Sequence, residues 1–191
     1  MLSRIRIYSL FWIVVIFYFI IPIIRPSIEC PGWIYYLDQF IPFVAWMVVP
    51  YYSYYIMFVI PPFIINDHKK LKLLTSLLIK LSLFCYLIYL IWPISSDVIL
   101  MQVRDSSFSF LHSSVTFDFL YQNALPSMHV AVSVLIGFAI AYEYPERRFV
   151  SYLWVLVIFL ATFLIKQHYI LDSIFGLLAA LPACYIYYRK C

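Results

Sequence analysis

The chain has 191 residues, of which 65% are hydrophobic, 21% aromatic and only 12% charged, which excludes an ordinary soluble domain. The formal net charge is +4 at pH 7, but the basic residues form short clusters beside apolar runs, a pattern that argues against nucleic acid as a partner. The four cysteines are scattered without the short spacing of a zinc site.

Apolar runs of roughly twenty residues, the length an α-helix needs to cross about 30 Å of hydrocarbon, recur along the chain. They predict an all-α, polytopic membrane protein with six spans, at residues 5–24, 40–65, 71–92, 125–142, 149–165 and 169–188. The first run is long, aromatic and without a small-residue cleavage site, so we expect it to be a retained span. Four prolines in the second run predict that it is kinked or frayed.

The basic residues predict the orientation of the spans. With the N-terminus in the cytoplasm, the inner side holds Arg4, Arg6, Lys69, Lys70, Lys72, Arg147, Arg148, Arg189 and Lys190, and the outer side holds Arg25, Arg104 and Lys166. This asymmetry favours cytoplasmic termini. The aromatic stretch 107–124 is then expected to cover the outer lipid interface. We expect one membrane domain over residues 1–191, with two N-terminal spans in 1–70 and a core in 71–191.

The stretch "KQHYILD", residues 166–172, carries ionisable side chains at the mouth of the sixth span. His168 and Asp172 are four residues apart and therefore share one face of a helix. A carboxylate there can hold the Nδ1 proton of the imidazole and leave Nε2 free as a base or nucleophile. A mutually satisfied polar pair that caps the helix is the alternative, and on this pair alone both interpretations stay open.

A second polar stretch, "ALPSMHV", opens the fourth span at residues 124–130. Proline suits the first helical position, which would put Ser127 and His129 in the first turn. The fourth and sixth spans both begin on the outer side, so two helix N-termini should converge into an anion site. A lone His129 is more often an interfacial histidine, but at the predicted depth of His168 and Lys166 it suits a phosphate.

At these residues the sequence resembles the type 2 phosphatidic acid phosphatase (PAP2) superfamily, whose membrane members share a six-helix core. The family's Pro-Ser-Gly-His motif corresponds to "PSMH", with Met128 in the glycine position. Its last motif is Ser-Arg, five residues, His, three residues, Asp. His168 and Asp172 match the second half, while Ala161 and Thr162 stand where Ser-Arg is expected.

The missing arginine makes the resemblance closer to the subgroup of inositol phosphorylceramide synthase-like proteins. Lys166 is a candidate for the missing charge, although it gives a point charge without a bidentate fork. The family's first motif is Lys, six residues, Arg-Pro. Arg104 lies at about the right distance before "PSMH", but Asp97 and Asp105 hold the lysine and proline positions. The resemblance runs from the third span to the C-terminus.

The resemblance implies a lipid phosphatase that needs neither a metal nor another cofactor. His168, oriented by Asp172, would attack phosphorus to give a phosphohistidine, and His129 would donate a proton to the leaving oxygen. The phosphoryl oxygens would be bound by Ser127, Lys166 and Arg104. Water as acceptor gives a phosphatase, and an alcohol such as inositol gives a phosphotransferase; the sequence leaves both open.

The predicted site lies near headgroup depth, so we expect its substrate to be a lipid phosphate within the bilayer. The resemblance implies phosphatidic acid, phosphatidylglycerol phosphate, undecaprenyl diphosphate or lipid A phosphates as candidates. A transporter or a non-catalytic scaffold is the rival from another class, although no internal repeat typical of transporters is visible. We expect a bacterial inner membrane, with the site facing the periplasm or exterior. The sequence says nothing about oligomeric state.

Overall fold

The computed structural model describes residues 1–116 and 124–191, so 117–123 of the predicted aromatic cover lie outside the described residues. Four described helices are long and apolar enough to cross a membrane. They are α1 (Leu2–Ile24), α5 (His68–Ile91), α9 (Arg148–Leu164, with the preceding turn η3, Pro145–Arg147) and α10 (Ile170–Lys190). More than half of the surface of Leu10, Ile13 and Ile16 on α1 is exposed, as expected for side chains that face lipid. These helices fit a membrane protein.

The predicted count of six spans is not confirmed, because the second and fourth predicted spans form shorter helices. The second is broken into η1 (Ala45–Met47), α3 (Val48–Val59) and α4 (Pro61–Ile64). Pro61 has no backbone N–H to donate to the preceding turn, which explains why α3 ends there even though Ile60 keeps helical dihedral angles. The predicted interruption of this run is therefore confirmed.

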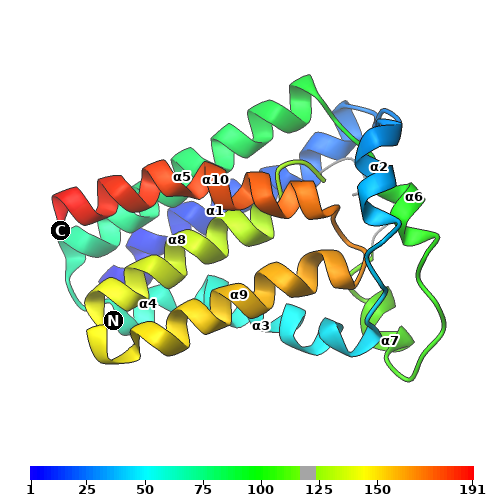
Figure 1. Cartoon of the computed structure of the whole chain (residues 1–191). Helices are drawn as coiled ribbons and strands as arrows, with labels where there is room; N and C mark the ends of the chain where they lie inside the picture. Colours follow the sequence, from blue (N-terminus) through cyan, green and yellow to red (C-terminus); the bar gives the residue numbers. More distant parts are fainter. Residues whose placement is uncertain (117–123) are drawn as a thin grey trace.

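The fourth predicted span is α8 (Met128–Glu143), a 16-residue helix at the centre of the bundle. It packs against α3, α5, α9 and α10 (Figure 1). Twelve of its residues are buried, because neighbours surround it on most sides. The prediction that Pro126 occupies the first helical position is wrong. Ser127 is the N-cap, with an extended backbone and a side-chain oxygen that accepts the Val130 N–H, as N-cap serines do.

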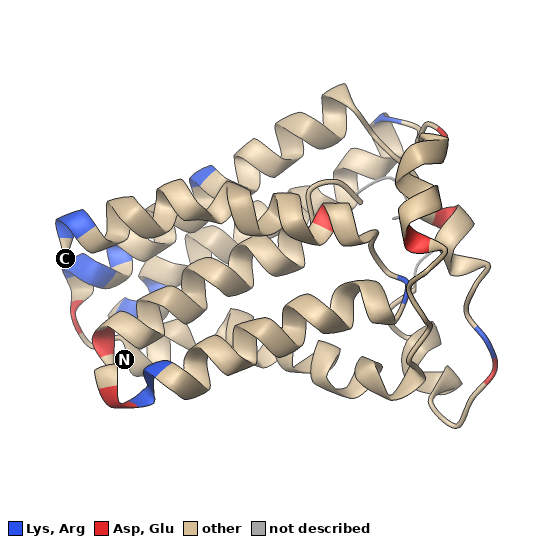
Figure 2. Ribbon diagram, viewed as in Figure 1, with Lys and Arg blue, Asp and Glu red and all other residues tan. Residues whose placement is uncertain are grey.

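Both chain termini lie at one end of the bundle, and α8 and α10 begin at the other (Figure 1). Three short helices gather at this second end: α2 (Gly32–Asp38), α6 (Asp97–Leu100) and α7 (Ser109–Ser113). Lysine and arginine are concentrated at the end that holds the termini (Figure 2). There Lys70 of α5 forms an ion pair of 2.9 Å with Glu143 of α8. The bundle therefore separates a basic end from the end that carries both motifs.

Candidate active site

The two motifs meet where α8 and α10 begin. The Ser127 backbone N–H donates to the Asp172 carbonyl oxygen at 2.8 Å. Gly176, one turn further along α10, faces the same place: a Cβ there would clash with the Ser127 carbonyl oxygen. Glycine is needed at this position because only hydrogen fits between the two backbones. The predicted convergence of the two helix starts is thus observed.

Gly176→Ala should lower both the thermal unfolding midpoint and turnover. Overpacking costs about 1–3 kcal/mol, which corresponds to a few degrees in a chain of this size. Gly32→Ala is the matched control, since nothing lies within 4 Å of its added methyl group. Thermal unfolding of the purified protein in detergent measures the difference. Equal midpoints for the two variants would contradict the proposed close approach.

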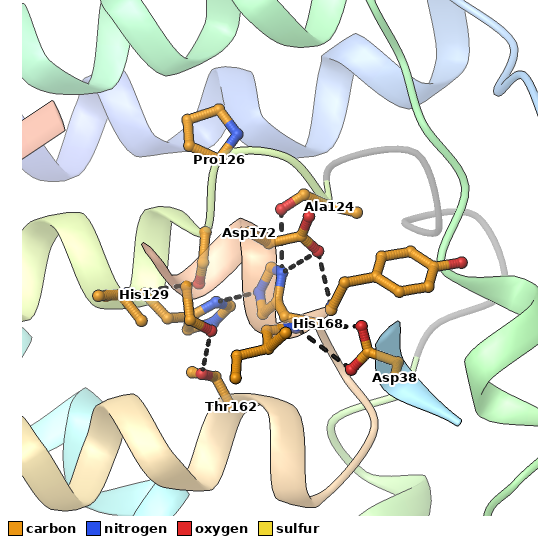
Figure 3. Close-up of polar contacts among 12 residues, drawn as sticks. Asp38, Ala124, Pro126, His129, Thr162, His168 and Asp172 are labelled. Atoms are coloured by element: carbon orange, nitrogen blue, oxygen red, sulfur yellow. Dashed lines mark hydrogen bonds and ion pairs between the residues drawn. The ribbon is translucent and has the colours of Figure 1, made fainter. Parts of the chain in front are cut away.

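A continuous chain of side chains crosses the site (Figure 3). His129 Nδ1 lies 3.2 Å from His168 Nε2, and His129 Nε2 lies 2.9 Å from the Tyr51 hydroxyl. On the far side, His168 Nδ1 lies 3.0 Å from the Ala124 carbonyl oxygen and 3.5 Å from Asp172 Oδ2. Helices α3, α8 and α10 and the turn before α10 therefore each contribute to one polar chain.

The ends of this chain determine where its protons lie. His168 Nδ1 faces two oxygen acceptors, so it carries the proton, and its Nε2 keeps a lone pair. His129 Nδ1–H then donates to that lone pair, while His129 Nε2 accepts from the Tyr51 hydroxyl. This arrangement holds His168 in the tautomer that a nucleophile attacking through Nε2 requires.

Asp172 is fully buried and serves two groups at once. Its Oδ2 accepts the Tyr169 backbone N–H at 2.8 Å and faces His168 Nδ1. Its Oδ1 has no hydrogen-bond partner among the described residues. The carboxylate therefore caps α10, as the structural alternative expected, and also orients the imidazole. One interpretation does not exclude the other.

The two histidines border a cavity of about 110 Å³. The opposite wall comes from α1 and α3, through the aromatic side chains Tyr18, Phe19, Tyr51, Tyr54 and Tyr55. Sequence reasoning missed these residues, because it separated the two N-terminal spans from the core. A signal was available in "YYSYY", residues 51–55. Its tyrosines at 51, 54 and 55 have the spacing of one helix face.

Tyr51→Phe should reduce turnover by about two- to tenfold, the usual value of one hydrogen bond. The change removes only the hydroxyl that contacts His129 Nε2 and keeps the buried ring. Steady-state kinetics on a phosphorylated lipid measure the loss. The control is Tyr52→Phe, because the Tyr52 hydroxyl that it removes donates to the Leu111 carbonyl outside the cavity. A loss of the same size in both variants would contradict a role for Tyr51 in the chain.

The two helix starts differ in what their amides already bind. At α10, the Tyr169 N–H is taken by Asp172, and the Ile170 N–H lies 3.2 and 3.3 Å from the Asp38 carboxylate oxygens. At α8, the N-cap Ser127 satisfies the Val130 N–H, and the first amides of the helix have no partner within it. Of the two helix starts, only that of α8 lines the cavity, through Met128 and His129, so its amides are the ones placed to bind an anion there.

The structure does not bring the two predicted basic phosphate ligands to the cavity wall. The Lys166 ammonium donates to backbone carbonyl oxygens instead, and Arg104 is exposed beside two surface hollows. At the position of the family's arginine, the Thr162 hydroxyl is 2.8 Å from Ser173 Oγ. Among residues 1–116 and 124–191, no three His, Cys, Asp or Glu side chains are grouped to hold a metal ion.

Comparison with known proteins gives one match. A sequence model described as the PAP2 superfamily matches residues 7–186. This range includes most of the first N-terminal span and all of the second. It is longer than the part, from the third span onward, in which the sequence resemblance was seen. No curated protein matches the chain, and no solved structure does.

Proposed function

This chain belongs to the PAP2 superfamily, and from that premise we propose that it hydrolyses a phosphate monoester or diphosphate of a membrane lipid through a phosphohistidine. Membership of the superfamily suggests a phosphatase-type activity. The observation that carries the finer proposal is the contact chain from Asp172 through His168 to His129 at the cavity wall. These three residues are the proposed catalytic residues.

In the first step His168 Nε2 attacks phosphorus, a P–N bond forms and the bond to the leaving oxygen breaks. His129, in its protonated form, gives its Nδ1 proton to that oxygen. The two nitrogens are 3.2 Å apart, so a phosphoryl group attacked by Nε2 must separate the rings. The Tyr51 hydroxyl can donate to or accept from His129 Nε2 and therefore suits both protonation states of the ring.

In the second step water attacks the phosphohistidine. His129, now neutral, accepts a proton from the water, the P–N bond breaks and His168 recovers its Nε2 lone pair. Throughout both steps Asp172 and the Ala124 carbonyl hold the His168 Nδ1 proton and stabilise the positive ring that phosphorylation creates. Of the proposed phosphate ligands, Ser127 is fully buried as the N-cap of α8 and does not line the cavity, so its part in phosphate binding is to hold the helix start, where amides favour an anion.

A lipid substrate is supported by the walls of the cavity. Phe19 and Tyr55 line it and are 44% and 42% exposed. Tyr55 also borders an open hollow of about 440 Å³, lined along α3 and α4 by Ile56, Val59, Ile60 and Phe63. An apolar chain can lie along this surface while its phosphate reaches the histidines. We place the site at the extracytoplasmic face of a bacterial inner membrane, opposite the basic end of the bundle (Figure 2).

A phosphotransferase of the inositol phosphorylceramide synthase-like kind is the second candidate. It is favoured by one observation: Thr162 of α9 stands where the hydrolase motif has an arginine, and its hydroxyl is hydrogen-bonded to that of Ser173. In this reaction an alcohol such as inositol, instead of water, attacks the phosphohistidine. The alcohol oxygen bonds to phosphorus and gives its proton to His129, and the P–N bond breaks as before.

Purified protein in detergent, with a chelator present, should release phosphate from at least one member of a panel of phosphorylated lipids. The panel includes phosphatidic acid, phosphatidylglycerol phosphate, undecaprenyl diphosphate and lipid A. Parallel reactions contain inositol. Free phosphate supports hydrolysis, and phosphate recovered on inositol supports the transferase. Absence of turnover in all reactions favours the scaffold or transporter alternative.

A further inference from the structure

The turn that carries His168 is fastened to a distant part of the chain. Lys166 has a φ of 63° and its side chain is fully buried. Its ammonium donates to the carbonyl oxygens of Asp38 at 3.2 Å and Ile41 at 2.7 Å. A left-handed backbone is uncommon outside glycine, and a buried ammonium is costly unless it is hydrogen-bonded. These two carbonyls, one on the last residue of α2 and one three residues beyond it, therefore hold Lys166 in place.

A second anchor lies on the other side of His168. The buried carboxylate of Asp38 accepts the backbone N–H of Ile170, the first residue of α10 (Figure 3). Asp38 thus caps a helix that begins 132 residues later in the chain. His168 lies between the two anchored residues, so the position of its ring depends on both.

The two anchors carry opposite charges that act on each other. Burial raises the pKa of Asp38 to about 6, and the Ile170 N–H and Lys166 oppose this rise, while Asp172 adds to it. Burial lowers the pKa of Lys166, and Asp38 opposes that fall. Each charge therefore favours the ionised form of the other.

We propose that Asp38 and Lys166 form a clamp that positions His168 for attack on phosphorus, and that Lys166 has this role instead of binding the substrate phosphate. The clamp rests on the proposed function. Both members are positioning residues, since neither lines the cavity. For Lys166 to reach a phosphate, its ammonium would have to leave both carbonyl oxygens, and these would lose a charged donor.

Kinetics of Lys166→Met, Asp38→Asn and the double variant separate the two roles of the lysine. The clamp predicts a kcat about tenfold lower in each single variant, with an unchanged KM. The double variant should have a kcat no lower than that of the less active single variant, because the effects of coupled residues do not add. A phosphate ligand predicts a raised KM and weaker inhibition by inorganic phosphate in Lys166→Met, with no effect of Asp38→Asn. That result would overturn the clamp.

Two further variants sharpen the comparison. Lys166→Arg should fail to restore activity, because a fully buried site between two carbonyls does not fit the larger, planar guanidinium. Restored activity would instead indicate a phosphate ligand. Lys80→Met is the matched control, since Lys80 is exposed on α5 and should leave kcat and KM unchanged.

A measurement without turnover keeps the clamp separate from the proposed reaction. In Lys166→Met and Asp38→Asn, the Ile170 amide should exchange hydrogen faster, and diethylpyrocarbonate should modify His168 at an altered rate. These changes support the clamp even if no lipid is hydrolysed, in which case only the proposed function fails. Unchanged exchange and unchanged His168 modification overturn the clamp, even if His168→Ala is inactive and the proposed function stands.

Discussion

His168→Ala is expected to abolish lipid phosphate release, with kcat lower by at least about a thousandfold, because it removes the proposed nucleophile. The wild-type protein, mixed briefly with labelled lipid phosphate and quenched in alkali, should carry label that is lost in acid, as a P–N bond predicts. The variant should carry none. Its backbone contact survives the change, because the residue 168 N–H donates to the Thr162 carbonyl.

The matched control is His68→Ala at the opposite end of the bundle, where the ring is exposed and contacts Ser3. This variant should keep wild-type turnover and labelling. The thermal unfolding midpoint of each variant separates loss of the nucleophile from loss of the fold. Turnover in a folded His168→Ala protein would exclude the phosphohistidine mechanism. A lower midpoint as the only effect would favour the capping role of the pair.

The pairing of His168 with Asp172 could be predicted from the sequence, but its geometry could not. Their side chains approach to 3.5 Å, yet His168 lies in the turn before α10, which begins at Ile170, so the prediction that both share one helix face is wrong. The contact forms because the Asp172 carboxylate reaches back to the N-cap residue Tyr169 and the turn before it. The meeting of His129 with His168 needed one further step, the topology that starts α8 and α10 at the same end. Alternating apolar runs give that topology even where the helix ends differ by a few residues.

The surroundings of Lys166 could not be predicted, because they depend on distant parts of the chain. Its neighbours in sequence, Gln167 and His168, line the cavity, but the left-handed backbone at 166 turns the lysine away from it. The carbonyls that bind it come from residues 38 and 41. The sequence around Lys166 contains no pattern that predicts a contact with residues more than 120 positions away.

The role of Tyr51 was hidden for a different reason. The chain has 18 tyrosines, and the sequence does not distinguish a tyrosine that faces lipid or fills the core from one that contacts a proposed catalytic residue. Only the break at Pro61 and the packing of α3 against α8 and α9 show which face of α3 points inward. The interrupted second run was therefore predicted, but its contribution to the site was not.

His129→Gln should slow hydrolysis of a lipid alkyl phosphate by about 10²- to 10⁴-fold, the usual contribution of general acid–base catalysis. An activated ester, such as an aryl phosphate, needs little protonation of its leaving oxygen, so its cleavage should fall much less. This difference follows if His129 Nδ1, 3.2 Å from the proposed nucleophilic nitrogen of His168, is the proton donor. Turnover of both substrates by the same protein preparation gives the ratio.

Hydrolysis of the phosphohistidine gives a second prediction for His129→Gln. With a labelled activated ester, phosphate label should accumulate on His168 of this variant. Phosphorylation then needs no acid, whereas hydrolysis still needs His129 to accept a proton from water. Tyr51→Phe should shift both measurements in the same direction by a smaller factor, because it changes only the partner of His129 Nε2. Equal losses on both esters, without accumulation of label, would mean that His129 binds phosphate instead of transferring a proton. The acid would then have to be a different group.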